Sequence, residues 1–194
     1  MTINSELDRL GGVLPLGAES FTPVQRSEIQ KISVEFHVEF AEDYVDFIEK
    51  YGCCSLGKEV FLRFERLDAV YIHDSDLCIP NYRREGCGLS HFYGVRIPLD
   101  TLNIEWALST YRGRMPRGSL PIADDGVGGQ ICYISDPLGK AGFYWWDHNN
   151  EWDEDDYLDE TGQEMPEAAK YQNLYFIAEN FEGFLKRAEV LPGI

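Results

Sequence analysis

The chain has 194 residues, of which 44% are hydrophobic and 13% aromatic, and its formal net charge is −17. This length and composition suit one folded domain with a sizeable core and argue against a disordered chain. The negative charge argues against nucleic-acid or anionic-membrane binding through a basic surface. It is easier to reconcile with a basic protein partner.

The chain shows no targeting pattern. Its first residues, MTINSELDRLGGVLPLG, lack a basic segment followed by a run of about seven apolar residues, and nowhere do about 18 apolar residues follow one another. The five cysteines, at positions 53, 54, 78, 87 and 132, include no CxxC pair, which suits free thiols in a reducing compartment. We therefore expect a cytoplasmic protein.

The first third of the chain is predicted to be helical after a short leader. Residues 1–21 contain three glycines and little periodicity, which indicates a loosely attached leader with one helical turn at most. The tetrapeptide TPVQ at 22–25 combines a capping Thr, a Pro suited to the first turn and a Gln that can reach back to the cap, so it predicts a helix start. A second helix is predicted over 42–51, with Gly52 at its end.

The middle of the chain is predicted to form short strands. Segments 60–64, 69–72 and 92–97 are rich in aromatic and β-branched residues, and 103–111 fits a helical stripe better than alternation. Residues 120–134, LPIADDGVGGQICYI, predict a hairpin whose turn is supplied by Asp124, Asp125 and Gly126. Its second strand is apolar on both faces and is predicted to be central.

The meander is predicted to continue at 139–148, GKAGFYWWDH. Alternation there sends Phe143 and Trp145 to one face and Tyr144 and Trp146 to the other. Residues 151–167 then hold nine acids and no Lys or Arg, so segment 151–170 is predicted to be a solvated acidic loop or insertion. An amphipathic helix over 174–185 is predicted to close the fold.

These segments, in this order, resemble the SUKH superfamily of small α+β domains, which includes many bacterial immunity proteins and a fungal regulator of cell-wall assembly. LPIADDGVGGQICYI resembles the family's LPIA-D-G-GD-ICLDL pattern, GFYWWDH its GKVYFWDHE strand, and NLYFIAENFEGFL at 173–185 its closing VA-SF-EFL helix. The chain departs from the family at Phe40 and Ala41, where the family has Leu-Pro, and at positions 52–54, where Gly-Cys-Cys replaces Asn-Gly-Gly.

The resemblance implies a single-domain α+β fold over residues 22–188. Its twisted sheet should be largely antiparallel or mixed, with N-terminal helices and a C-terminal helix packed against it. Residues 1–21 would be the leader, about 151–170 the acidic insertion and 189–194 a C-terminal tail.

Few residues form a catalytic pattern. There is no GxSxG, HExxH or paired CxxC, and the histidines at 37, 73, 91 and 148 carry no local signature. Asp124 and Asp125 could be paired catalytic carboxylates, but Asp before Gly is ordinary turn chemistry. The glycines at 126–129 favour a turn over a phosphate loop, because a strand follows and no Lys is present. We therefore expect a protein that is not an enzyme and holds no metal or cofactor.

The acidic segment allows two interpretations, a solvated face or a contact surface for a basic protein. Aromatic side chains set beside charge are typical of protein-binding hot spots. The candidate partner-binding residues are Trp146, Trp152, Asp153, Asp155, Asp156 and Asp159.

The resemblance implies an immunity protein that binds a cognate toxin, often a nuclease in this family, and blocks it by occlusion. An acidic inhibitor can be steered onto a basic nuclease and mimic a phosphate backbone. The alternative is a regulatory or scaffold module that binds a cellular protein without inhibiting a toxin, as the fungal relatives imply. An enzyme would need a pocket with convergent polar groups, which the sequence neither shows nor excludes.

Overall fold

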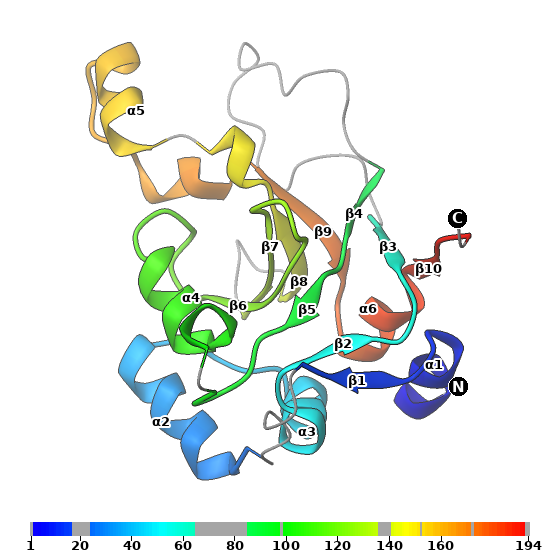
Figure 1. Ribbon diagram of the computed structural model, residues 1–194. Coiled ribbons are helices and arrows are strands. Elements are labelled where there is room, and N and C mark those ends of the chain that lie inside the picture. The colour runs from blue at the N-terminus through cyan, green and yellow to red at the C-terminus, as the bar shows by residue number, and fades with distance from the viewer. Residues whose placement is uncertain are drawn as a thin grey trace.

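The computed structural model describes residues 2–16, 24–64, 85–97, 99–135, 141–151, 153–171 and 173–192. Its architecture is the α+β fold that the sequence predicts, with helices packed around a mostly antiparallel sheet (Figure 1). The α-helices are α1 (Ile3–Arg9), α2 (Arg26–Phe36), α3 (Glu42–Tyr51), α4 (Ile104–Thr110), α5 (Glu154–Thr161) and α6 (Phe181–Lys186). Short 3-10 helices are η1 (Asp100–Leu102), η2 (His148–Asn150) and η3 (Glu167–Tyr171).

The strands of the described residues form two sheets. The strands are β1 (Val13–Pro15), β2 (Cys54–Leu56), β3 (Val60–Arg63), β4 (Gly86–Gly88), β5 (His91–Phe92), β6 (Ser119–Asp124), β7 (Gln130–Ile134), β8 (Gly142–Trp146), β9 (Leu174–Ala178) and β10 (Ala188–Val190). The larger sheet has the order β1-β2-β5-β6-β7-β8-β9 and the smaller one β10-β3-β4, with antiparallel pairing throughout.

The predicted hairpin and meander are confirmed. β6 pairs with β7 from Ser119 opposite Ile134 to Asp124 opposite Gln130, and β7 pairs in turn with β8. β7 therefore lies inside the sheet, as its two apolar faces predict. The predicted strand at 69–72 lies outside the described residues.

The alternation along β7 and β8 separates two hydrophobic clusters. Ile131 and Trp145 belong to the main core beneath the helices, whereas Cys132, Tyr144 and Trp146 belong to a smaller cluster on the other face. Both clusters are buried, so this part of the sheet is covered on both faces. This explains why β7 and β8 carry apolar residues on both faces.

The predicted closing helix is wrong in its first half. Residues 174–178 form strand β9, which pairs with β8 and is buried at every position, and only Phe181–Lys186 is helical. The run Leu-Tyr-Phe-Ile-Ala is rich in strand-forming residues, and burial on both faces removes the alternation that would have identified it. Asn180 then starts α6 by accepting a hydrogen bond from the Gly183 N–H at 2.8 Å.

Two shorter predictions differ in extent. The strand predicted over 92–97 is limited to His91–Phe92, and Arg96 within the predicted segment has a left-handed φ of 55°. Helix α2 begins after Gln25, whose N–H is accepted by the Glu28 carboxylate at 3.3 Å. The cap predicted at Thr22 lies outside the described residues.

The second predicted helix is confirmed. Helix α3 spans 42–51 as predicted and ends at Gly52, which has a φ of 59°.

Residues 2–16 pack against the rest of the fold, whereas the sequence predicts a loosely attached leader over 1–21. Leu7 and Leu10 of the α1 region are buried, and β1 pairs with β2. Arg9 donates hydrogen bonds at 2.8 Å to the backbone carbonyls of Leu185 and Ala188. These contacts reach the other end of the chain, so a local reading of the sequence does not reveal them.

Candidate functional site: the acidic projection

The acidic segment contains helix α5, in place of the loop predicted there. Asp153 caps the helix by accepting the Asp156 N–H at 2.8 Å, and Glu154, Asp155 and Asp156 fill its first turn. Acids in a first turn favour helix formation because they face the positive end of the helix dipole. Gly162 ends the helix in the left-handed conformation, with a φ of 68°.

Helix α5 stands away from the sheet at one edge of the molecule (Figure 1). Tyr157 is its only buried residue, and Leu158 is 46% exposed among the acids. We call residues 153–164 the acidic projection.

Arg114 anchors the chain that leads into the projection. Its guanidinium makes a bidentate contact with the Glu151 carboxylate and lies 2.9 Å from Nδ1 of His148. The same guanidinium lies over the rings of Tyr111 and Trp146, at 5.3 and 5.6 Å from their centroids. Planar contacts of this kind suit Arg, which stacks on aromatic rings and pairs bidentately with carboxylates.

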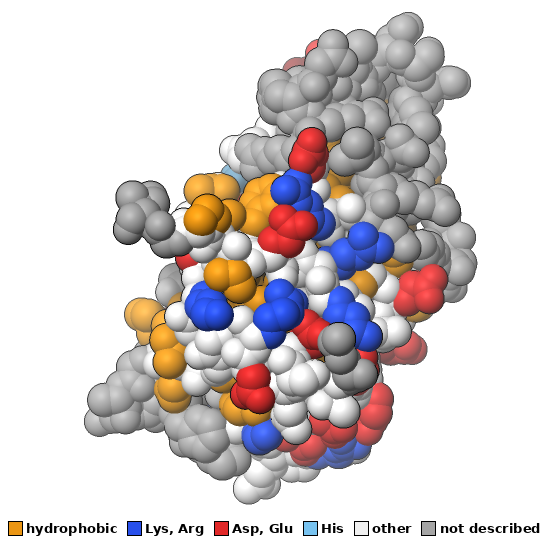
Figure 2. All heavy atoms as spheres, turned by 90° about the vertical axis from the view of Figure 1, so that its right-hand side faces the viewer, with side chains coloured by type: hydrophobic (Ala, Val, Ile, Leu, Met, Phe, Trp, Pro, Cys, Tyr) orange, Lys and Arg blue, Asp and Glu red, His pale blue; other side chains and the backbone are white. Residues whose placement is uncertain are grey.

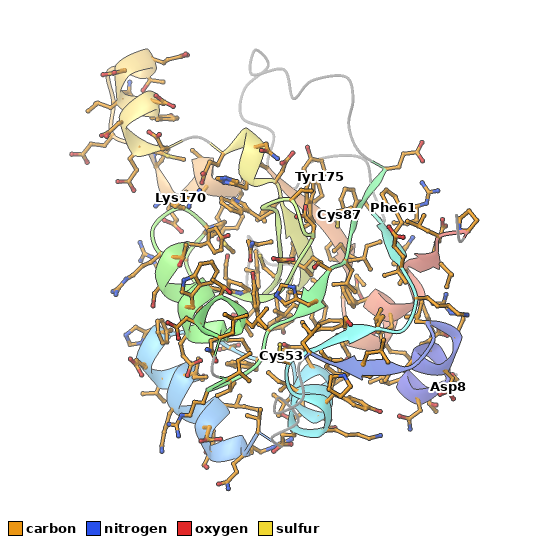
Figure 3. All side chains as sticks on the ribbon, in the orientation of Figure 1. Asp8, Cys53, Phe61, Cys87, Lys170 and Tyr175 are labelled. Carbon is orange, nitrogen blue, oxygen red and sulfur yellow. The ribbon has the colours of Figure 1, made fainter. Side chains whose placement is uncertain are left out.

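A second anchor, Lys170, lies at the foot of the projection, next to the loop that carries Arg114. Figure 3 shows Lys170 there, and its Nζ lies 3.1 Å from the Glu154 carboxylate and donates to the Gly113 carbonyl. Glu167 accepts the backbone N–H of Arg117 at 2.5 Å. Cations from outside the acidic run therefore hold its first residues, Glu151 and Glu154, whereas most of helix α5 faces solvent.

The structure places the predicted partner-binding residues in different settings. Asp155, Asp156 and Asp159 are exposed on α5, and none has an ion-pair partner within the part of the chain that the structure describes. Asp153 is also exposed but serves as the helix cap. Trp152 lies outside the described residues.

Trp146 needs a correction, because it has no exposed surface. It lies in the smaller cluster with Cys132 and Tyr144, beneath the Arg114 guanidinium. An aromatic ring in this position cannot anchor a partner. Its role is to support Arg114, and through Arg114 the connection to Glu151.

The motif at 120–134 shapes a turn. The carboxylate of Asp125 accepts the N–H groups of Val127 and Gly129 at 2.8 and 2.9 Å, and the Trp145 indole N–H at 3.0 Å. Burial raises the pKa of Asp125, and these hydrogen bonds oppose the increase. All its contacts lie within the fold, so this residue holds the turn against β8.

Ser90, His91 and Asp124 are the described residues that come nearest to a hydrolytic arrangement. Nδ1 of His91 lies 3.2 Å from Ser90 Oγ and 3.5 Å from the Asp124 carboxylate. A relay from serine to carboxylate needs both ring nitrogens, yet here Ser and Asp share one, and Nε2 is buried without a partner in the described chain. Burial lowers the pKa of His91, opposed by the charge of Asp124.

The described cysteines are buried: Cys53, Cys54, Cys87 and Cys132. Burial raises the pKa of Cys53 to about 11, so its thiol stays protonated at neutral pH. Among the residues with described positions, no group of three His, Cys, Asp or Glu side chains could hold a metal ion. The helices in that part of the chain are also too short or too polar to cross a membrane.

Comparison with known proteins identifies the family. The model of the SMI1 / KNR4 family (SUKH-1) matches residues 23–187, most of the chain. The chain belongs to this family. It is also 30% identical over 129 residues to the SPbeta prophage-derived uncharacterized protein YokK of Bacillus subtilis (strain 168). That match covers 62% of this chain and 60% of YokK, so the chain spans less than two thirds of its relative. No solved structure matches the chain.

Membership of the SUKH-1 family confirms the resemblance seen in the sequence. The sequence analysis does not identify two features of this region: the exposed Leu158 on the projection and the contact between Arg114 and Glu151 that anchors it. Leu158 lies in a run of acids, where a single apolar residue gives no periodic signal. Arg114 is 37 positions from Glu151, and nothing in a single sequence indicates that contact.

Proposed function

We propose that this SUKH-1 protein is an immunity-type protein that binds a basic protein toxin through the acidic projection and occludes it without catalysis. The observation that carries the proposal is the exposure of Asp155, Asp156 and Asp159 on a projecting helix, where none of them forms an ion pair within the described chain. Family membership supports the same conclusion.

The arrangement suits capture of a basic surface. Unpaired acids leave a negative potential that steers a cationic protein and speeds its association. Leu158, 46% exposed among these acids, offers an apolar contact that gains most when a partner removes it from water. The anchors at Glu151 and Glu154 hold the helix in place, which lowers the entropy lost on binding.

The experiment is co-expression with the toxin-like protein encoded beside the gene, scoring growth rescue and recovery of a complex at low and moderate salt. We expect rescue and a complex that salt weakens. The triple variant D155N/D156N/D159N should slow association and flatten its salt dependence, with the fold unchanged by circular dichroism.

The matched control is D8N/E59Q/E179Q, which changes the net charge equally at exposed sites. Asp8 lies on α1, far from Lys170 at the foot of the projection (Figure 3). Equal association rates for the two triple variants would remove the projection from the mechanism. Absence of both rescue and complex would count against the immunity function itself and favour a regulatory or scaffold role.

A further inference from the structure

A groove separates the end of helix α2 from the loop that joins α4 to β6. Its volume is about 490 Å³, within the range of about 300–1,000 Å³ that small-molecule sites occupy. Its walls are short: residues 35–38 on one side and mainly 111–119 on the other. The apolar lining includes Phe36, Val38, Leu108, Tyr111 and Met115.

The rim of the groove carries two arginines, Arg112 and Arg117, that form no ion pair within the described residues. Other arginines contact carboxylates: Arg9, Arg26, Arg63, Arg96 and Arg114. Arg112 and Arg117 are exposed, and neither guanidinium forms an ion pair with a carboxylate of the described residues. Acids lie nearby: Arg112 shares a second hollow with Asp153, Glu154 and Asp155, and Glu167 contacts the backbone N–H of Arg117. In a chain with a net charge of −17, two free guanidinium groups at one groove favour an anionic occupant.

A buried hydroxyl gives a second, independent indication. Ser119 lines the groove, is only 7% exposed, and its Oγ has no hydrogen-bond partner in the described chain. A buried polar group without a partner is destabilising. Because Oγ has almost no accessible surface, an oxygen of a bound ligand would reach it once the Ser119 side chain rotates toward the groove. His37 adds a further polar ring at the rim and is held there by a left-handed backbone, with a φ of 55°. Glu35 is the one acid in the lining.

We propose that this groove binds a small organic anion, with an apolar body on the groove floor and its charged group between Arg112 and Arg117. A small molecule fits better than an extended peptide because the walls are only one helical turn and one short loop long. The groove lining includes none of the acids of the projection.

The test uses the full chain and two fluorescent probes that share an aromatic body. One is the anion 8-anilino-1-naphthalenesulfonate and the other is uncharged N-phenyl-1-naphthylamine. We expect saturable binding of the anion at one site, with displacement by decanoate. R112Q/R117Q should weaken anion binding by about tenfold or more and leave the uncharged probe nearly unchanged. The control K31Q/R96Q removes equal charge outside the groove and should leave both affinities unchanged.

Ser119→Ala tests the contribution of the buried hydroxyl to anion affinity. It should lower the affinity for the anion without lowering the unfolding temperature, because it removes a hydroxyl that has no partner in the described chain. Three results would overturn the proposal: equal anion affinity in R112Q/R117Q and its control, no saturable binding, or displacement by an acidic peptide but not by decanoate.

Discussion

The acidic projection and the opposite side of the molecule are both rich in acids, but ion pairs are more frequent on the opposite side. On the face that includes α1, β3, β10 and α6, Lys and Arg side chains lie among the acids (Figure 2). Ion pairs there are Arg9–Glu6, Arg63–Glu85, Arg63–Glu189 and Lys186–Glu182. We call this the paired face. On the projection, Glu154 is the one acid of the described helix with such a partner, through Lys170.

The difference shows that the number of acids does not by itself define a binding surface. At Glu6, Glu85, Glu182 and Glu189 of the paired face, a basic partner would have to compete with cations already in place. On the projection, Asp155, Asp156 and Asp159 form no ion pair within the described residues, so their negative potential is available to a basic partner. Local pairing, more than net charge, therefore distinguishes the two regions.

The sharpest way to test this comparison is to remove one arginine from each region. Arg114→Met should lower the free energy of unfolding by about 1.5–3 kcal/mol, because it removes charge-assisted hydrogen bonds to Glu151, whose side chain is only 17% exposed. Met preserves the apolar contact with Tyr111 and Trp146. Arg63→Met on the paired face should have a much smaller effect, because its partners Glu85 and Glu189 are exposed.

Urea unfolding of both variants is the measurement, and 0.5 M salt is the control condition. Salt should reduce the small loss of unfolding free energy in Arg63→Met and leave most of the loss in Arg114→Met, because the contact between Arg114 and Glu151 is partly buried. Equal losses of stability in the two variants would mean that the projection is no better anchored than the paired face.

The sequence predicts those parts of the fold that depend on neighbours along the chain. The turn at Asp124, Asp125 and Gly126 and the alternation along β8 are local patterns, and both are confirmed. Strand β9 is different: Leu174, Ile177, Phe181 and Phe184 have helical spacing, and a strand buried on both faces has no alternation to oppose that reading.

The candidate site depends more strongly on distant contacts. Alternation places Trp146 on the second face of the sheet, but only the structure shows that Tyr111, Tyr171 and Arg114 cover that face. The same limit applies to the anchors of the projection, since Lys170 meets Gly113 across 57 positions. Composition locates the acids, and tertiary structure decides which of them stay unpaired.

A second test acts on the projection alone. Asp153→Ala removes the cap that holds the Asp156 N–H, and caps of this kind contribute about 1 kcal/mol. We expect faster amide hydrogen exchange across residues 154–161, with little change on the paired face. Asp155→Ala is the matched control, because Asp155 is exposed in the first turn but does not cap the helix. Equal exchange rates in the two variants would show that the cap does not order α5.

The smallest effect concerns a single pair on the paired face. The hydrogen bond from Lys186 lowers the pKa of Glu182 below its ordinary value of 4.5, and slight burial opposes this. A lowered pKa means that the pair stabilises the fold above the unfolded-state pKa and that this contribution is lost as pH falls through the folded-state pKa. Carbon-detected NMR titration of Glu182 should therefore show a midpoint below 4.5, and Lys186→Met should return it toward 4.5. A midpoint that Lys186→Met leaves unchanged would mean that the paired face is not neutralised by its own cations, and the contrast with the projection would lose its basis.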